Sequence, residues 1–100
     1  MDNTIDLATI RYYTFCAFVR QLNERFGGHI TSWWRSPAHN ATLAGEVADS
    51  EHQTGTAIDY NFDAGTVVVP GYFTRWCAER GVEAQKEADH WHLQLRPTLP

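Results

Sequence analysis

Histidines and acidic residues at two places in the chain have the types and spacing of metal ligands. The first place is the stretch Ser50 to Asp59 (SEHQTGTAID), in which six residues separate His52 from Asp59. The second is Asp89-His90-Trp91-His92, near the C-terminus. Two histidines and one carboxylate would hold one zinc ion and leave one coordination position open, and an open position distinguishes a catalytic zinc site from a structural one. These residues therefore predict a metallohydrolase.

Two predicted strands would bring these side chains together. Residues 56–62 alternate in character, so Asp59 lies on the opposite face from Ile58 and Tyr60. A second strand is predicted over residues 90–95, and His90 and His92 project to one face because they are two residues apart. If the two strands are neighbours, the ligands meet without any unusual backbone conformation.

The residues around the expected metal each have more than one interpretation. Asp89, three residues before His92, could be the base that takes a proton from the attacking water, or a turn residue at the start of the strand. His90 could be a fourth ligand, which would close the site, or it could orient the water or stabilise a developing oxyanion. Arg35 could bind a substrate carboxylate or carbonyl, or form a salt bridge with the acidic loop over residues 46–51.

The remaining pattern predicts an α+β domain. Apolar residues recur at helical spacing over residues 10–26, and Gly27-Gly28 ends that helix. Asn3, Thr4 or Thr9 could cap its start. Further elements are expected as a strand over 29–34, a short helix from Ser36-Pro37 to Gly45, a helix from Pro70 or Gly71 to before Gly81, and a strand over 82–85.

Length, charge and apolar content limit the classes of function. One hundred residues fit a single domain over 1–100, and a net charge of −4 with a single lysine argues against a nucleic-acid partner. The longest apolar run, Val67 to Val69, is too short for membrane insertion, and the N-terminus lacks the pattern of a signal peptide. We expect a monomer that is made in the cytoplasm. Cys16 and Cys77 are expected to be buried free thiols rather than a disulfide.

Three blocks of the sequence, taken together, resemble a known family. They are Trp33-Trp34-Arg35-Ser36-Pro37-Ala38-His39-Asn40, the pattern S-x-H-x-x-G-x-A-x-D over residues 50–59, and D-H-x-H over residues 89–92. The chain is similar to the zinc D-Ala-D-Ala carboxypeptidase and L-alanyl-D-glutamate endopeptidase family from about Phe26 to Leu95. The resemblance implies the hedgehog-type α+β fold, with a small antiparallel sheet that carries the zinc site and packs against the long N-terminal helix and one or two further helices.

The resemblance also implies a role for each site residue. His52, Asp59 and His92 would be the zinc ligands, and Asp89 would be the general base and proton shuttle. His90 would stay outside the ligand set and support the transition state. Arg35 would position the substrate, and Ser50 matches the family's serine beside the site.

The expected reaction is the zinc-dependent hydrolysis of a peptidoglycan stem peptide at a bond that involves a D-amino acid. Water deprotonated by Asp89 would attack the peptide carbonyl, and zinc with Arg35 or His90 would stabilise the oxyanion. Small size and short loops favour an open groove, and therefore an endopeptidase that acts on the cell wall after release, as in a phage lysis cassette. The alternative is a non-catalytic zinc domain that binds cell-wall peptide or a protein partner.

Overall fold

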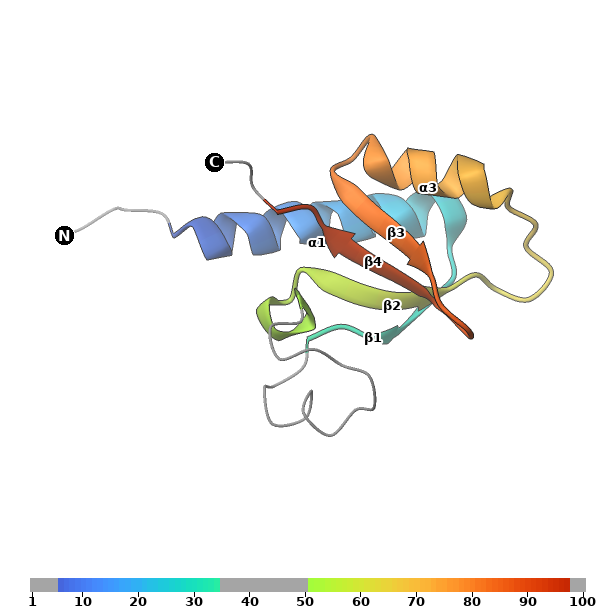
Figure 1. The fold of residues 1–100 in the computed structure, drawn as a ribbon, viewed down its shortest axis with the longest axis horizontal. Helices are drawn as coiled ribbons and strands as arrows, with labels where there is room; N and C mark the ends of the chain where they lie inside the picture. The colour runs from blue at the N-terminus through green and yellow to red at the C-terminus, as the bar shows by residue number, and fades with distance from the viewer. Residues whose placement is uncertain (1–5, 35–50, 98–100) are drawn as a thin grey trace.

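The described part of the chain is an α+β domain with a four-stranded antiparallel sheet (Figure 1). The computed structural model describes residues 6–34 and 51–97. In chain order the elements are α1 (Leu7–Phe26), β1 (His29–Ser32), the 3-10 helix η1 (Glu51–Thr54), β2 (Ala57–Asn61), α3 (Pro70–Ala78), β3 (Val82–Lys86) and β4 (Trp91–Leu95).

Strand order in the sheet is β1-β2-β4-β3, and each neighbouring pair is antiparallel. The last two strands form a hairpin, whereas β2 reaches its neighbour β4 only after α3 and β3 have intervened in the sequence. Asp59 of β2 is directly opposite His92 of β4, and His92 is directly opposite Gln85 of β3. Residues directly opposite on antiparallel strands have side chains on the same face, so these three residues share one face of the sheet.

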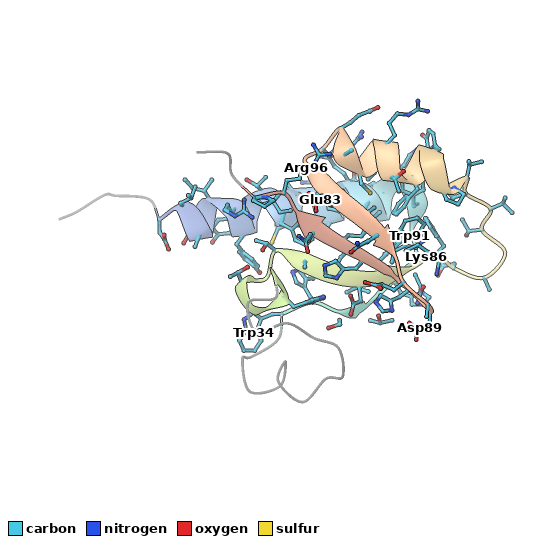
Figure 2. The ribbon with its side chains drawn as sticks, in the orientation of Figure 1. Trp34, Glu83, Lys86, Asp89, Trp91 and Arg96 are labelled. Carbon is cyan, nitrogen blue, oxygen red and sulfur yellow. The ribbon has the colours of Figure 1, made fainter. Side chains whose placement is uncertain are left out.

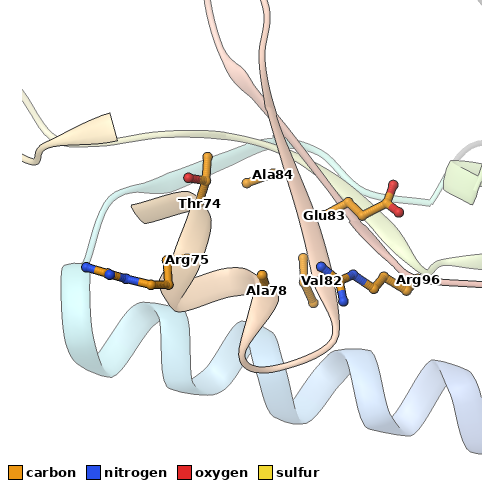
Figure 3. Close-up of a pocket in the computed structure, with 7 residues that line it drawn as sticks. All are labelled: Thr74, Arg75, Ala78, Val82, Glu83, Ala84 and Arg96. Carbon is orange, nitrogen blue, oxygen red and sulfur yellow. The ribbon is translucent and has the colours of Figure 1, made fainter. Parts of the chain in front are cut away.

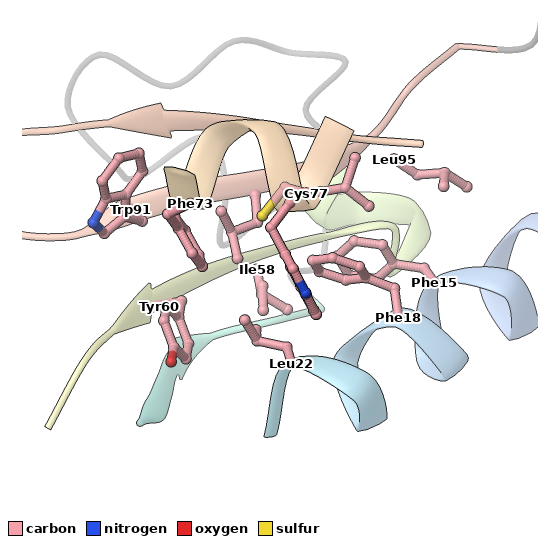
Figure 4. Packing of buried hydrophobic residues seen from close by; sticks show 12 residues of the cluster. Phe15, Phe18, Leu22, Ile58, Tyr60, Phe73, Cys77, Trp91 and Leu95 are labelled. Carbon is pink, nitrogen blue, oxygen red and sulfur yellow. The ribbon is translucent and has the colours of Figure 1, made fainter. Parts of the chain in front are cut away.

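The other face of the sheet carries the hydrophobic core, which both helices cover (Figure 4). In α1 the buried residues follow helical spacing at Phe15, Phe18 and Leu22. The core cluster joins these to α3 and to the strands, through the buried residues Ile58, Tyr60, Phe73, Trp76, Cys77, Val82, Trp91, Leu93 and Leu95. Aromatic rings dominate the packing, and the prediction that the long first helix lies behind the sheet is confirmed.

The ends of α1 show how local sequence sets the helix. Asp6 is the N-cap, and its carboxylate accepts a hydrogen bond of 3.2 Å from the backbone N–H of Ala8. The prediction of a cap at Asn3, Thr4 or Thr9 is therefore wrong, and the helix starts three residues before the predicted Ile10. At the other end, Gly27 adopts φ +67°, which ends the helix as predicted.

Other predicted elements agree with the structure to within a few residues. The predicted strand over 29–34 ends at Ser32, and the one over 90–95 begins at Trp91 rather than His90, which lies in the bend before it. The predicted helix over 36–45 lies outside the described residues, as does most of the acidic loop. Both cysteines are free, but only Cys77 is fully buried, because Cys16 is partly exposed on α1. No helix in the described ranges has the length and apolar character to cross a membrane.

Candidate metal centre

His52 lies in the short helix η1 and contacts the segment that follows β1. Its side chain is fully buried, and its Nδ1 lies 2.7 Å from the backbone carbonyl oxygen of Trp33. A carbonyl can only accept, so Nδ1–H donates and Nε2 of the neutral ring keeps its lone pair. The indole N–H of Trp33 in turn donates to the carbonyl oxygen of Gly55 at 2.8 Å. Trp33 therefore fixes both the turn after His52 and the ring nitrogen that His52 can offer to a metal.

Asp59 and His92 meet as a cross-strand pair. They are directly opposite in the β2–β4 register, and Nδ1 of His92 lies 3.4 Å from Oδ1 of Asp59. The same oxygen lies 3.2 Å from Nε2 of His52. Because Ile58 and Tyr60 on either side of Asp59 are buried in the core, the strand cannot rotate the carboxylate away from the two rings.

The three side chains form a group that could bind a metal ion. One donor atom from each of His52, Asp59 and His92 lies within 4.8 Å of the other two. Two imidazole nitrogens and a carboxylate oxygen are ligands that zinc accepts. In both histidines the second nitrogen already has an acceptor, which is the usual arrangement for metal-ligating histidines. The predicted ligand residues are thus brought together by two strands and a 3-10 helix.

Electrostatics within the group favour an ionised Asp59. Burial alone would raise the pKa of this carboxyl, but the hydrogen bonds that His52 and His92 donate when their rings are protonated hold it well below its usual range. The hydrogen bond to Asp59 also raises the pKa of His92 above its usual value. A carboxylate that stays charged among imidazoles supplies the negative charge that a divalent cation needs.

His90 lies beside this group, and Asp89 lies beyond it. Nε2 of His90 is 3.5 Å from Oδ1 of Asp59, and its Nδ1 is 2.6 Å from Oδ1 of Asp89. The Asp89 side chain is 88% exposed at the turn between β3 and β4 (Figure 2). The hydrogen bond from His90 lowers the pKa of Asp89. His90 therefore lies between Asp89 and the candidate metal centre and contacts both Asp89 and Asp59.

Two predicted site residues, Arg35 and Ser50, lie outside the described residues. Gln94 is a residue of the site that was not predicted, and its side-chain oxygen lies 2.8 Å from Nε2 of His92. Strand alternation could have indicated Gln94, because it is two residues after His92 and on the same face. The role of the Trp33 carbonyl could not have been read from residue types, since every residue has a backbone carbonyl.

Two hollows flank the outer strand β3. One, of about 210 Å³, adjoins the centre and is lined by Glu83, Ala84, Gln85, His92 and Gln94; we call it the β3–β4 hollow. The other, of about 440 Å³, lies between α3 and β3, with Arg75 and Arg96 at its opposite ends (Figure 3). None of the three candidate ligands lines this larger hollow, so its size does not make it the metal centre.

Comparisons with known proteins find no match, so the function is inferred from the residues of the site. The chain matches no family model, and neither the curated proteins nor the solved structures contain a significant match to it.

Proposed function

We propose that the chain is a zinc metallopeptidase that hydrolyses a peptidoglycan stem peptide. The observation that carries the proposal is the convergence of His52, Asp59 and His92, each ring offering one nitrogen while its other nitrogen is hydrogen-bonded. Three protein ligands are the number typical of catalytic zinc sites. Zinc bound there would act as a Lewis acid and lower the pKa of a coordinated water to about 7.

Support for the hedgehog-type peptidase fold comes from the sequence blocks and the position of the site together. The S-x-H-x-x-G-x-A-x-D block covers η1 and β2, and the D-H-x-H block covers the turn into β4. The first block supplies His52 and Asp59 and the second supplies His92; Asp59 and His92 lie on the face of the antiparallel sheet opposite the helices. We propose the hedgehog-type fold on these two grounds.

In the proposed reaction the protein's own residues move the proton and stabilise charge. Asp89 accepts a proton from the water that attacks the peptide carbonyl and returns it to the leaving amine. Its low pKa keeps the carboxylate ionised and able to accept a proton at neutral pH. His90, between Asp89 and Asp59, stabilises the oxyanion that develops on the carbonyl. Arg35 and Ser50 are proposed to position the substrate.

The proposed substrate bond involves a D-amino acid, and we favour an endopeptidase of endolysin type over a carboxypeptidase. A carboxypeptidase would need a cationic group to receive the free carboxylate at the scissile end, whereas an endopeptidase needs an open groove on both sides of the bond. The small domain favours an open groove on both sides of the bond. We propose that the protein acts as a monomer on the cell wall after release from the cell that makes it.

Substituting Asp89 with asparagine tests the proposal. With zinc-loaded protein and purified peptidoglycan, mass spectrometry of the released muropeptides identifies the bond that is cut. Asp89→Asn should bind zinc normally and lose about 10²- to 10⁴-fold in turnover, the usual contribution of a positioned base. Glu87→Gln removes a carboxylate from the same turn region and should keep full turnover. Unchanged turnover in Asp89→Asn would overturn the assignment of the base.

The alternative function is a non-catalytic zinc domain that binds cell-wall peptide or a protein partner. The observation that favours it is the 88% exposure of the Asp89 side chain, because a general base is usually directed at the reacting atoms. Absence of any new muropeptide from zinc-loaded wild-type protein, together with retention of the protein on peptidoglycan, would support this function instead.

A further inference from the structure

The side chain of Gln94 contacts the ring nitrogen of His92 that faces away from Asp59. Its Oε1 lies 2.8 Å from Nε2 of His92, and both residues face the β3–β4 hollow. The oxygen of an amide accepts, so in the neutral ring Nε2 carries the hydrogen and Nδ1 keeps its lone pair. That lone pair is on the nitrogen 3.4 Å from Oδ1 of Asp59, where a metal would bind.

We propose that Gln94 is a positioning residue that makes Nδ1 of His92 the ligand atom. This inference rests on the proposed metal site but not on the reaction assigned to it. Without Gln94, the carboxylate of Asp59 remains as an acceptor 3.4 Å from Nδ1, and it would draw the hydrogen onto that nitrogen. A protonated Nδ1 has no lone pair for a metal. Gln94 therefore competes with Asp59 for the single hydrogen of the neutral ring.

A comparison with His52 and His90 shows why the tautomer of His92 depends most on a single side chain. His52 is anchored by the backbone carbonyl of Trp33, which no substitution removes, and His90 is anchored by the carboxylate of Asp89, which accepts from either oxygen. Only His92 depends on an amide, which could also turn round and donate through its NH₂ group. The turned amide would place the hydrogen on Nδ1 and abolish ligation.

The neighbouring strand favours the productive orientation of the amide. Glu83 is directly opposite Gln94 in the β3–β4 register, and both line the β3–β4 hollow. An ionised carboxylate only accepts hydrogen bonds, so it favours an amide whose NH₂ group is directed towards β3 and whose oxygen is directed towards His92. The order Glu83, Gln94, His92 along the sheet thus gives the ring one preferred tautomer.

Gln94→Leu tests the proposal, with Gln94→Glu and Gln85→Leu as matched variants. Gln94→Glu keeps an acceptor that cannot donate when ionised. Gln85→Leu removes a second glutamine from the same hollow, directly opposite His92 in the register but without the 2.8 Å contact. The first measurement is the tautomer of His92 in ¹⁵N-labelled metal-free protein, from long-range ¹H–¹⁵N correlation at a pH where the ring is neutral. The second is zinc affinity by competition with a chromophoric chelator.

We expect wild type, Gln94→Glu and Gln85→Leu to carry the hydrogen on Nε2, and Gln94→Leu to shift it towards Nδ1. Zinc affinity should fall about 10- to 100-fold in Gln94→Leu, as for other residues that hold a ligating histidine, and should be kept in the two matched variants. An unchanged tautomer and an affinity within about twofold of Gln85→Leu would overturn the proposal. If wild type binds no zinc, the proposed function fails, and the tautomer measurement alone decides the role of Gln94.

Discussion

The two faces of the sheet have different roles: one carries the hydrophobic core and the other carries the candidate metal centre, and alternate residues of the same strands contribute to each. On β2, Ile58 and Tyr60 are buried in the core while Asp59, between them, lies in the candidate centre. On β4, Trp91 and Leu93 are buried on either side of His92. A shift of one residue in register would exchange the two sets. The core face therefore fixes the register, and the register brings the ligands of the other face together.

The largest effect is expected from breaking the core face. Phe73 is fully buried, and the centroid of its ring lies 4.8 Å from the ring centroid of Phe62 and 5.0 Å from that of Trp91. Phe73→Ala should lower the free energy of unfolding by about 3–5 kcal/mol, because it removes an aromatic side chain and leaves a cavity. Urea unfolding monitored by tryptophan fluorescence measures this change.

Tyr13→Ala is the control for that experiment, since Tyr13 is 66% exposed on α1. It should change the free energy of unfolding by less than about 0.5 kcal/mol. Equal losses in the two variants would contradict the assignment of the core to the face that the helices cover.

A slightly smaller effect is expected from breaking the opposite face. Asp59→Asn keeps the shape of the side chain and removes the charge that contacts His52 and His92. If a four-ligand zinc site contributes about 10–16 kcal/mol, one ligand contributes about 3 kcal/mol, so zinc affinity should fall on the order of 100-fold. Isothermal titration with zinc measures the affinity. Asp63→Asn, which alters an exposed carboxylate paired with His29, should leave it unchanged.

The smallest expected effect is a dependence on pH that separates the metal-free from the loaded protein. Contact with Asp59 raises the pKa of His92 in the folded state. The metal-free protein thus gains stability from this pair below the unfolded pKa of about 6.5, and loses it as the pH rises through the folded pKa. Zinc affinity should change in the opposite direction, because binding requires neutral rings. Urea unfolding and zinc titration across the same pH range would reveal whether the two trends diverge.

Particular residues show how far the sequence could predict this molecule. Alternation over residues 56–62 placed Asp59 opposite its buried neighbours, and the two-residue spacing led to His92. Successive side chains of any strand point to opposite faces, so the order of apolar and polar residues reveals which face each occupies. The 3-10 helix around His52 was not predicted, since a strand and a tight turn both tolerate its Ser, Gly and Thr neighbours. The cap at Asp6 was missed because several residues before the helix can serve as caps, and only the fold selects among them.

The contact of His52 with Trp33 could not be predicted from the sequence. It joins a ring nitrogen to a backbone carbonyl 19 residues earlier in the chain. No side-chain pattern reports where a backbone group will lie once β1 has been placed against β2. Such contacts can be found only from coordinates, and they decide which nitrogen His52 offers.

Asp59 and His92 lie on different strands, so the metal centre can form only after these strands have paired during folding. The two ligands are 33 residues apart in the chain and become neighbours only when β4 has paired with β2 in the correct register. During refolding, high-affinity capture of an ion should therefore coincide with this long-range pairing and follow the formation of α1. Adding a chelator at successive times after dilution from urea would measure when the ion becomes tightly bound. That time would report when β2 and β4 pair, a step expected to be slow because the paired residues are far apart in the chain.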